Sequence, residues 1–207
     1  MSSKFLKGAF ILTLGAIISK ILGLFYVIPF EHMVGNKGAT LYQYGYVPYT
    51  IFISFATAGM PLAVSKFISK YNALEEYAVG EKLFKSSLKL MVVTGFLAFL
   101  ILYTMAPLFT GVFGVRQEDV SDVTEIIRAV SFALIFVPFM SIIRGFFQGH
   151  EAMEPTAISQ VIEQIVRIVF LLAGVYVVLN VLDGELVRAI QVATFAATVG
   201  AVGGLVV

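Results

Sequence analysis

Long runs of apolar residues alternate with short polar segments along the whole chain. A helix needs about 20 mostly apolar residues to cross the hydrocarbon core of a bilayer, and six segments meet that requirement. They cover approximately residues 8–30, 44–66, 86–109, 122–144, 155–180 and 186–207. The pattern therefore predicts an all-α transmembrane bundle with six spans.

The composition agrees with a membrane protein and removes several functional classes. Of the 207 residues, 59% are hydrophobic and 13% are charged, which is too apolar for a soluble domain. The net charge is only +1 and the lysines are dispersed, so no basic face for nucleic acid is expected. The chain contains no cysteine, which excludes thiol chemistry and cysteine-ligated metal. We expect no cofactor, no metal and no nucleic-acid partner.

The sequence also lacks the motifs of the common enzyme classes. It contains no HExxH metal motif, no glycine-rich phosphate loop and no nucleophile elbow. Its two histidines, His32 and His150, both fall in predicted loops. Because metal or acid–base catalysis has so few groups to use, we predict a protein that is not an enzyme and has no catalytic residue.

Basic residues gather on one side of the predicted membrane. Lys4 and Lys7 precede the first span, five lysines surround the loop between the second and third, and Arg144 begins the loop after the fourth. The opposite side holds fewer: Lys37, Arg116 and Arg188. Because cytoplasmic loops carry the excess of lysine and arginine, this asymmetry predicts a cytoplasmic N-terminus. The tyrosines between residues 42 and 49 fit an interfacial aromatic belt on the outer side.

Charged residues inside the fifth span are the strongest functional signal. Glu163 and Arg167 lie about 12 and 18 Å along the helix from Pro155, which is the middle of the membrane. Thr156 and Gln160 continue the same polar face at helical spacing. An ionisable residue at this depth usually lines a cavity or a substrate path. The alternative is a buried pair that only joins helices.

Lys20 lies in the first span, about 18 Å from its start at Gly8. The first and fifth spans run in the same direction, so Lys20, Glu163 and Arg167 fall at similar depth. We predict that all three face one cavity, with Glu163 paired to one of the two cations. A lysine that reaches for the membrane interface is the alternative for Lys20.

Two prolines predict bends within the spans. Pro61 ends the sequence Ala-Gly-Met-Pro in the second span, and Pro138 lies near the centre of the fourth. Proline removes a helical hydrogen bond and clashes with the preceding turn. Broken helices at membrane depth are where transporters place hinges and sites. We predict that Pro61 and Pro138 act as hinges between inward-open and outward-open states.

Three segments of the chain resemble a known family. They are ISKILGLFYVIPF (residues 18–30), YVPYTIFISFATAGMPLAVSKFISKYNAL (46–74) and RGFFQGHEAMEPTAISQVIEQIVRI (144–168). The segments resemble the MurJ-type lipid II flippases of the multidrug/oligosaccharidyl-lipid/polysaccharide exporter superfamily. The similarity is to the Gram-positive branch, which also contains the SpoVB-like polysaccharide biosynthesis proteins. The chain looks like the N-terminal lobe of such a two-lobed transporter, with the C-terminal lobe missing.

The resemblance implies a flippase in the bacterial cytoplasmic membrane. It would move an undecaprenyl-pyrophosphate-linked precursor, lipid II or a related lipid-linked saccharide, by alternating access. Its partners would be this substrate, membrane lipids and the second lobe. The resemblance further implies that Lys20 faces the lipid pyrophosphate. Where Gram-negative relatives have a second arginine in the first span, this chain has Tyr26. The predicted substrate-binding residues are Lys20, Arg144, Gln160, Glu163 and Arg167.

Two other functions stay open at this point. A cation-coupled multidrug exporter of the same superfamily would bind cations with carboxylates, but the first span carries Lys20 and no acidic residue. A scaffold without transport would explain six helices, but not the charges at shared depth.

Overall fold

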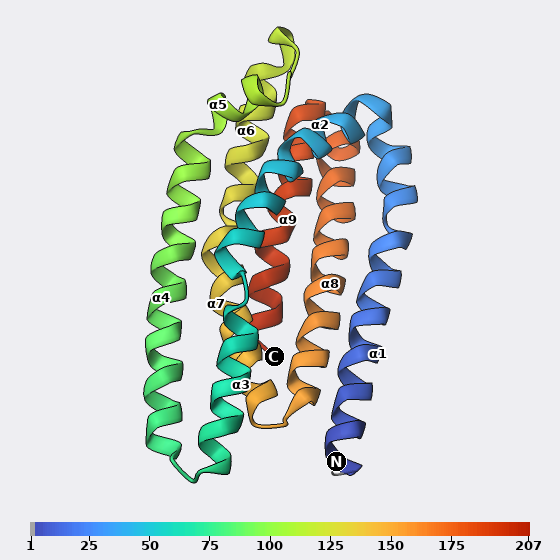
Figure 1. The fold of residues 1–207 in the computed structure, drawn as a ribbon. Helices are drawn as coiled ribbons and strands as arrows, with labels where there is room; N and C mark the ends of the chain where they lie inside the picture. The colour runs from blue at the N-terminus through green and yellow to red at the C-terminus, as the bar shows by residue number, and fades with distance from the viewer. Residues whose placement is uncertain (1–2) are drawn as a thin grey trace.

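A computed structural model describes the backbone of residues 3–207 and the side chains of residues 6–207. The helices run alongside one another in a single bundle, with the N-terminus at one end (Figure 1). Six helical segments of this described part are long and apolar enough to cross a membrane, and it contains no strand. This confirms the predicted all-α bundle of six spans.

The six crossings consist of single helices or of two helices in succession. In chain order the elements are α1 (Ser3–Phe25), α2 (Val27–Thr57), α3 (Met60–Ala73), α4 (Tyr77–Thr104), α5 (Ala106–Val112), the 3-10 helix η1 (Gln117–Asp119), α6 (Val120–Ser131), α7 (Ala133–Gly149), α8 (Met153–Tyr176), the π-helical η2 (Val177–Val181) and α9 (Leu186–Leu205). The second crossing is α2 with α3, and the fourth is α6 with α7.

The segment between the first two apolar runs is helical. Pro29 has no N–H for the carbonyl of Phe25, and the chain turns at Tyr26 between α1 and α2. A second bend follows at Gly35, whose φ of 64° favours glycine. Between these bends and its descent into α3, α2 passes across the upper end of the bundle (Figure 1).

The two proline positions differ in what the backbone does there. Ala58 and Gly59 interrupt the second crossing, and Gly59 takes a φ of 69°. Pro61 follows in the first turn of α3, where a missing N–H costs no helical hydrogen bond. In contrast, α7 continues through Pro138, and the fourth crossing is interrupted at Phe132 instead. Only Pro61 therefore lies beside a break.

Glycines of α9 set the position of the polar face of α8. A Cβ added at Gly200, Gly203 or Gly204 would lie 2.9, 3.0 or 3.1 Å from atoms of α8. Small residues let helix backbones approach closely in a membrane, where apolar side chains gain little by leaving lipid. The other side of α9 packs into the main core, which contains Ile126 and Ile190. The face of α8 that carries Glu163 is therefore held against the interior of the bundle.

Candidate anion-binding site

Arg144, Glu163 and Arg167 meet inside the bundle. One carboxylate oxygen of Glu163 accepts a hydrogen bond from Nη2 of Arg144 at 2.9 Å. The other oxygen accepts one from Nη2 of Arg167 at 2.7 Å. The three side chains are largely buried, with 15%, 14% and 19% exposed for Arg144, Glu163 and Arg167. A single carboxylate thus bridges two guanidinium groups, and we call these three residues the charge triad.

Three helices contribute to the surroundings of the triad. Glu163 and Arg167 are one turn apart on α8, which brings their side chains together. Ser159, one turn earlier, accepts hydrogen bonds from Nη2 and Nε of Arg144 at 2.8 and 3.2 Å. Its hydroxyl donates to the carbonyl of Gly204 on α9 at 2.6 Å. Side-chain hydrogen bonds therefore join α7, α8 and α9 at this level.

Arg144 lies inside α7, so the prediction that it begins a loop is wrong. Helix α7 continues to Gly149, and only His150–Ala152 separate it from α8. Arg144 is an interior residue and does not count toward the basic residues of the loops. A span predicted from hydropathy ends at an arginine, because hydropathy contains no information about the partners that compensate the charge. Here those partners are Ser159 and Glu163.

Lys20 lies on α1, which packs against α8 through glycines. A Cβ at Gly15 would lie 2.9 Å from the Cβ of Ala157. At 3.6 residues per turn, Lys20 is roughly 140° around the helix from Gly15. Most of α1 away from this contact is exposed and apolar, as expected for contact with lipid: Leu6, Phe10, Leu14, Ile17, Ile18, Ile21, Leu24 and Phe25. Lys20 is exposed, and the residues one turn away on its own face, Ile17 and Leu24, are exposed and apolar as well.

The geometry brings together some of the predicted residues but not all of them. Glu163 pairs with Arg167, one of the two partners expected for it, and with Arg144. Among the ion pairs of the described side chains, none includes Lys20. Lys20 is an exposed cation on α1, which contacts α8 at Ala157 and Gln164.

Several polar atoms of α1 and α8 are buried without a protein partner. They include Oε1 of Gln160, Nε of Arg167 and Oγ of Ser19. Buried polar groups are nearly always satisfied, and those without a protein partner commonly bind water or a ligand. A cavity of about 230 Å³ also borders Arg144 and Ser159. The polar face of α8 thus has donors and acceptors that its own fold leaves free.

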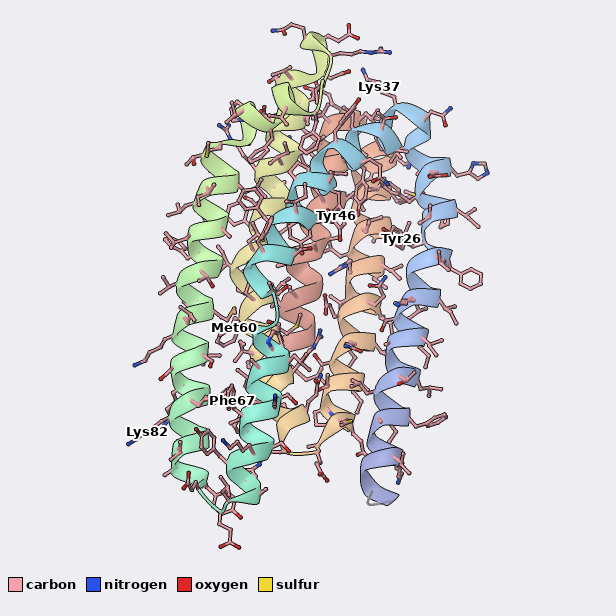
Figure 2. The ribbon with its side chains drawn as sticks, viewed as in Figure 1. Tyr26, Lys37, Tyr46, Met60, Phe67 and Lys82 are labelled. Carbon is pink, nitrogen blue, oxygen red and sulfur yellow. The ribbon has the colours of Figure 1, made fainter. Side chains whose placement is uncertain are left out.

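Tyrosines of α2 lie in the interior of the bundle and not at its surface. Tyr42 and Tyr49 are 8% and 4% exposed, so the predicted interfacial belt is wrong for them. The rings of Tyr42 and Tyr46 stack, with centroids 5.3 Å apart. Figure 2 shows Tyr46 on α2 in the upper half of the bundle. The spacing of four residues between Tyr42 and Tyr46 was the available signal.

This arrangement suits an anion. Guanidinium groups bind phosphate oxygens in pairs, and an ammonium group adds a point charge. Arg144, Arg167 and Lys20 supply these cations, and tyrosine hydroxyls can donate further hydrogen bonds. Within residues 3–207, no cluster of three or more histidine, aspartate or glutamate side chains could hold a metal ion. The chemistry available is binding and charge compensation.

Comparison with known proteins gives consistent relatives. Lipid II flippase MurJ of Bacillus subtilis (strain 168) is 54% identical over 211 residues, covering 100% of this chain and 39% of the relative. The uncharacterized membrane protein YabM of the same organism is 34% identical, covering 80% of this chain and 30% of the relative. Stage V sporulation protein B, also from that strain, is 28% identical, covering 79% and 31%. No solved structure gives a significant match.

The chain spans less than two fifths of the length of these relatives. The six apolar crossings and the similarity to a bacterial flippase identify a multi-pass protein of a bacterial membrane. The polysaccharide biosynthesis protein family matches residues 5–207, which is nearly the whole sequence. This confirms the resemblance found in the three sequence segments, and the chain belongs to the polysaccharide biosynthesis protein family.

Proposed function

We propose that this chain forms one lobe of a flippase that moves a lipid-linked cell-wall saccharide across the bacterial cytoplasmic membrane. The observation that carries the proposal is the charge triad at mid-membrane depth, with Lys20 on the adjacent helix. Its substrate would be an undecaprenyl-diphosphate-linked saccharide such as lipid II. The similarity to a protein named as a lipid II flippase supports this substrate class.

The proposed mechanism divides the substrate between two environments. Lys20 and Arg167 hold the diphosphate, because cations in a low-dielectric interior bind phosphate oxygens strongly. The polyprenyl chain stays in the surrounding lipid throughout, so its movement requires no free energy for burial or desolvation. Glu163 compensates the arginines when the site is empty, and Gln160 offers an amide to the bound headgroup. Rocking of the lobe at Pro61, and at Pro138, exposes the site to each side in turn.

The distribution of basic residues supports a cytoplasmic N-terminus. Lys82 projects from the end of α4 that lies level with the N-terminus (Figure 2), and Lys37 lies at the opposite end. The lysines near the N-terminal end of the bundle outnumber the basic residues at the other end, as on the cytoplasmic side of membrane proteins. In this orientation the triad is reached from the leaflet in which the precursor is made.

The test is a transport assay on the protein at its complete natural length, reconstituted in liposomes with undecaprenyl-diphosphate saccharides. We expect Lys20→Ala to abolish flipping while expression and folding are kept. Lys82→Ala is the matched control, because it removes the same charge from an exposed position outside the bundle. Normal flipping by Lys20→Ala would assign the buried charges a structural role. Export of cationic drugs driven by an ion gradient, without flipping, would favour the multidrug exporter instead.

A further inference from the structure

The charge triad already contains an anion of its own. Glu163 accepts one hydrogen bond on each carboxylate oxygen, from Arg144 at 2.9 Å and from Arg167 at 2.7 Å. Charge-assisted bonds of this length are about twice as strong as neutral ones. Any anionic ligand that binds both arginines must therefore displace this carboxylate or compete with it.

The membrane itself supplies the competing ligands. Bacterial cytoplasmic membranes contain anionic phospholipids with phosphodiester headgroups, in large excess over any precursor. The same cations that attract a diphosphate also attract these headgroups. Arg144 borders a cavity of about 230 Å³, through which a headgroup can approach this arginine. A cationic site with no competing group of its own would be occupied by the headgroups of bulk lipid.

We propose that Glu163 is a specificity-determining residue that excludes anionic phospholipids from the site. This inference rests on the proposed function, because it assumes a diphosphate substrate. A phosphodiester carries a single negative charge and would only replace the charge of the carboxylate that it displaces. A diphosphate carries more charge and more acceptor oxygens, so it can engage Arg144, Arg167 and Lys20 together.

The site discriminates between phosphodiester and diphosphate because Glu163 makes binding of the phosphodiester unfavourable. Specificity depends on the difference in affinity between two ligands, and a group that opposes the wrong one increases this difference. Glu163 repels both anions, but only the ligand with surplus charge gains enough from the three cations to overcome the repulsion. Ser159 keeps Arg144 directed at the site through bonds of 2.8 and 3.2 Å while the carboxylate is displaced.

The experiment measures binding of undecaprenyl diphosphate to the full-length protein in nanodiscs. One set of nanodiscs contains only zwitterionic phosphatidylcholine, and the other contains a large fraction of phosphatidylglycerol. For the unsubstituted protein we expect nearly equal dissociation constants in both lipids. For Glu163→Gln we expect phosphatidylglycerol to weaken diphosphate binding about tenfold, the size of one charge-assisted hydrogen bond. The ratio between lipids cancels any change in intrinsic affinity.

Two further variants keep the result decisive. Glu125→Gln removes a carboxylate that binds Gln191 away from the triad, and it should retain the ratio of the unsubstituted protein. Glu163→Asp keeps the charge but its shorter side chain cannot serve both arginines, so we expect a smaller dependence on phosphatidylglycerol. If Glu163→Gln does not fold, Glu163→Asp takes its place in the experiment. The proposal is then overturned if phosphatidylglycerol does not weaken diphosphate binding to Glu163→Asp.

The two possible failures are distinguishable. If the unsubstituted protein binds no undecaprenyl diphosphate in either lipid, the proposed function fails and the exclusion role fails with it. If it binds the diphosphate but Glu163→Gln shows the same ratio between lipids as the unsubstituted protein, only the exclusion role of Glu163 is refuted.

Discussion

Replacing Glu163 by alanine should destabilise this lobe more than replacing either arginine. The carboxylate is the only anion of the triad, so its loss leaves two largely buried guanidinium groups without compensation. Breaking a buried ion pair by removing one partner costs about 3 kcal/mol or more. Arg144→Ala leaves Glu163 bound to Arg167 at 2.7 Å, and Ser159 still donates to Gly204. We expect its cost to be roughly 1.5–3 kcal/mol, that of a hydrogen bond to a charged group.

The assay is a double-mutant cycle on Arg144 and Glu163, with unfolding followed in detergent micelles. When Glu163 is already absent, removal of Arg144 takes away an uncompensated charge and should be stabilising. We therefore expect a coupling energy of roughly 1–3 kcal/mol between the two sites. Glu125→Ala is the control, because its carboxylate is exposed and contacts Gln191 rather than an arginine.

The electrostatic account is refuted if Glu163→Ala and Glu125→Ala cost the same. Additive effects of the two triad substitutions would also contradict it. In either case water would enter the interior and replace the carboxylate as a partner of the arginines. The two ion pairs would then contribute as little to stability as pairs exposed to solvent.

Four other substitutions test different parts of the structure. Gly200→Val should lower the thermal unfolding temperature, since overpacking at a Cβ site 2.9 Å from Arg167 costs about 1–3 kcal/mol, whereas Gly111→Ala, with open space around it, should not. Pro61→Ala and Pro138→Ala should alter flipping rates more than stability if these prolines are hinges, and unchanged rates in both would leave only tolerated kinks. Arg167→Lys should bind diphosphate more weakly than the natural protein, because an ammonium cannot grip two oxygens in the fixed geometry of a guanidinium; equal binding would mean that charge alone suffices.

The sequence was sufficient for the bundle because each crossing carries its own signal. An apolar run of about 20 residues is a local property, and a membrane leaves helices as the only structure for it in a chain of this kind. The polar face of α8 was equally readable, since Gln160, Glu163 and Arg167 follow helical spacing within one segment. Positions within a single helix are therefore predictable without its neighbours.

What the sequence could not show depends on contacts between helices. Arg144 is interior only because Glu163 and Ser159, at 19 and 15 residues' distance along the chain, reach it from α8. Tyr42 and Tyr49 are interior only because α2 begins at Val27 and bends at Gly35. Hydropathy assigns charge and hydroxyl groups to the interface by default, and tertiary partners override that default.

The balance of charge at the level of the triad favours an anionic substrate over a cationic one. Among the described side chains at this depth, Arg144, Arg167 and Lys20 are opposed by the single carboxylate of Glu163. A site for cationic drugs or coupling ions needs the reverse excess, since it must supply carboxylates to the ligand. In a low-dielectric interior such an excess of positive charge persists only if a ligand, water or lipid compensates it. The proposed substrate, a polyprenyl diphosphate, would supply the missing negative charge while its tail remained in the lipid, which neither a neutral ligand nor a cation could do.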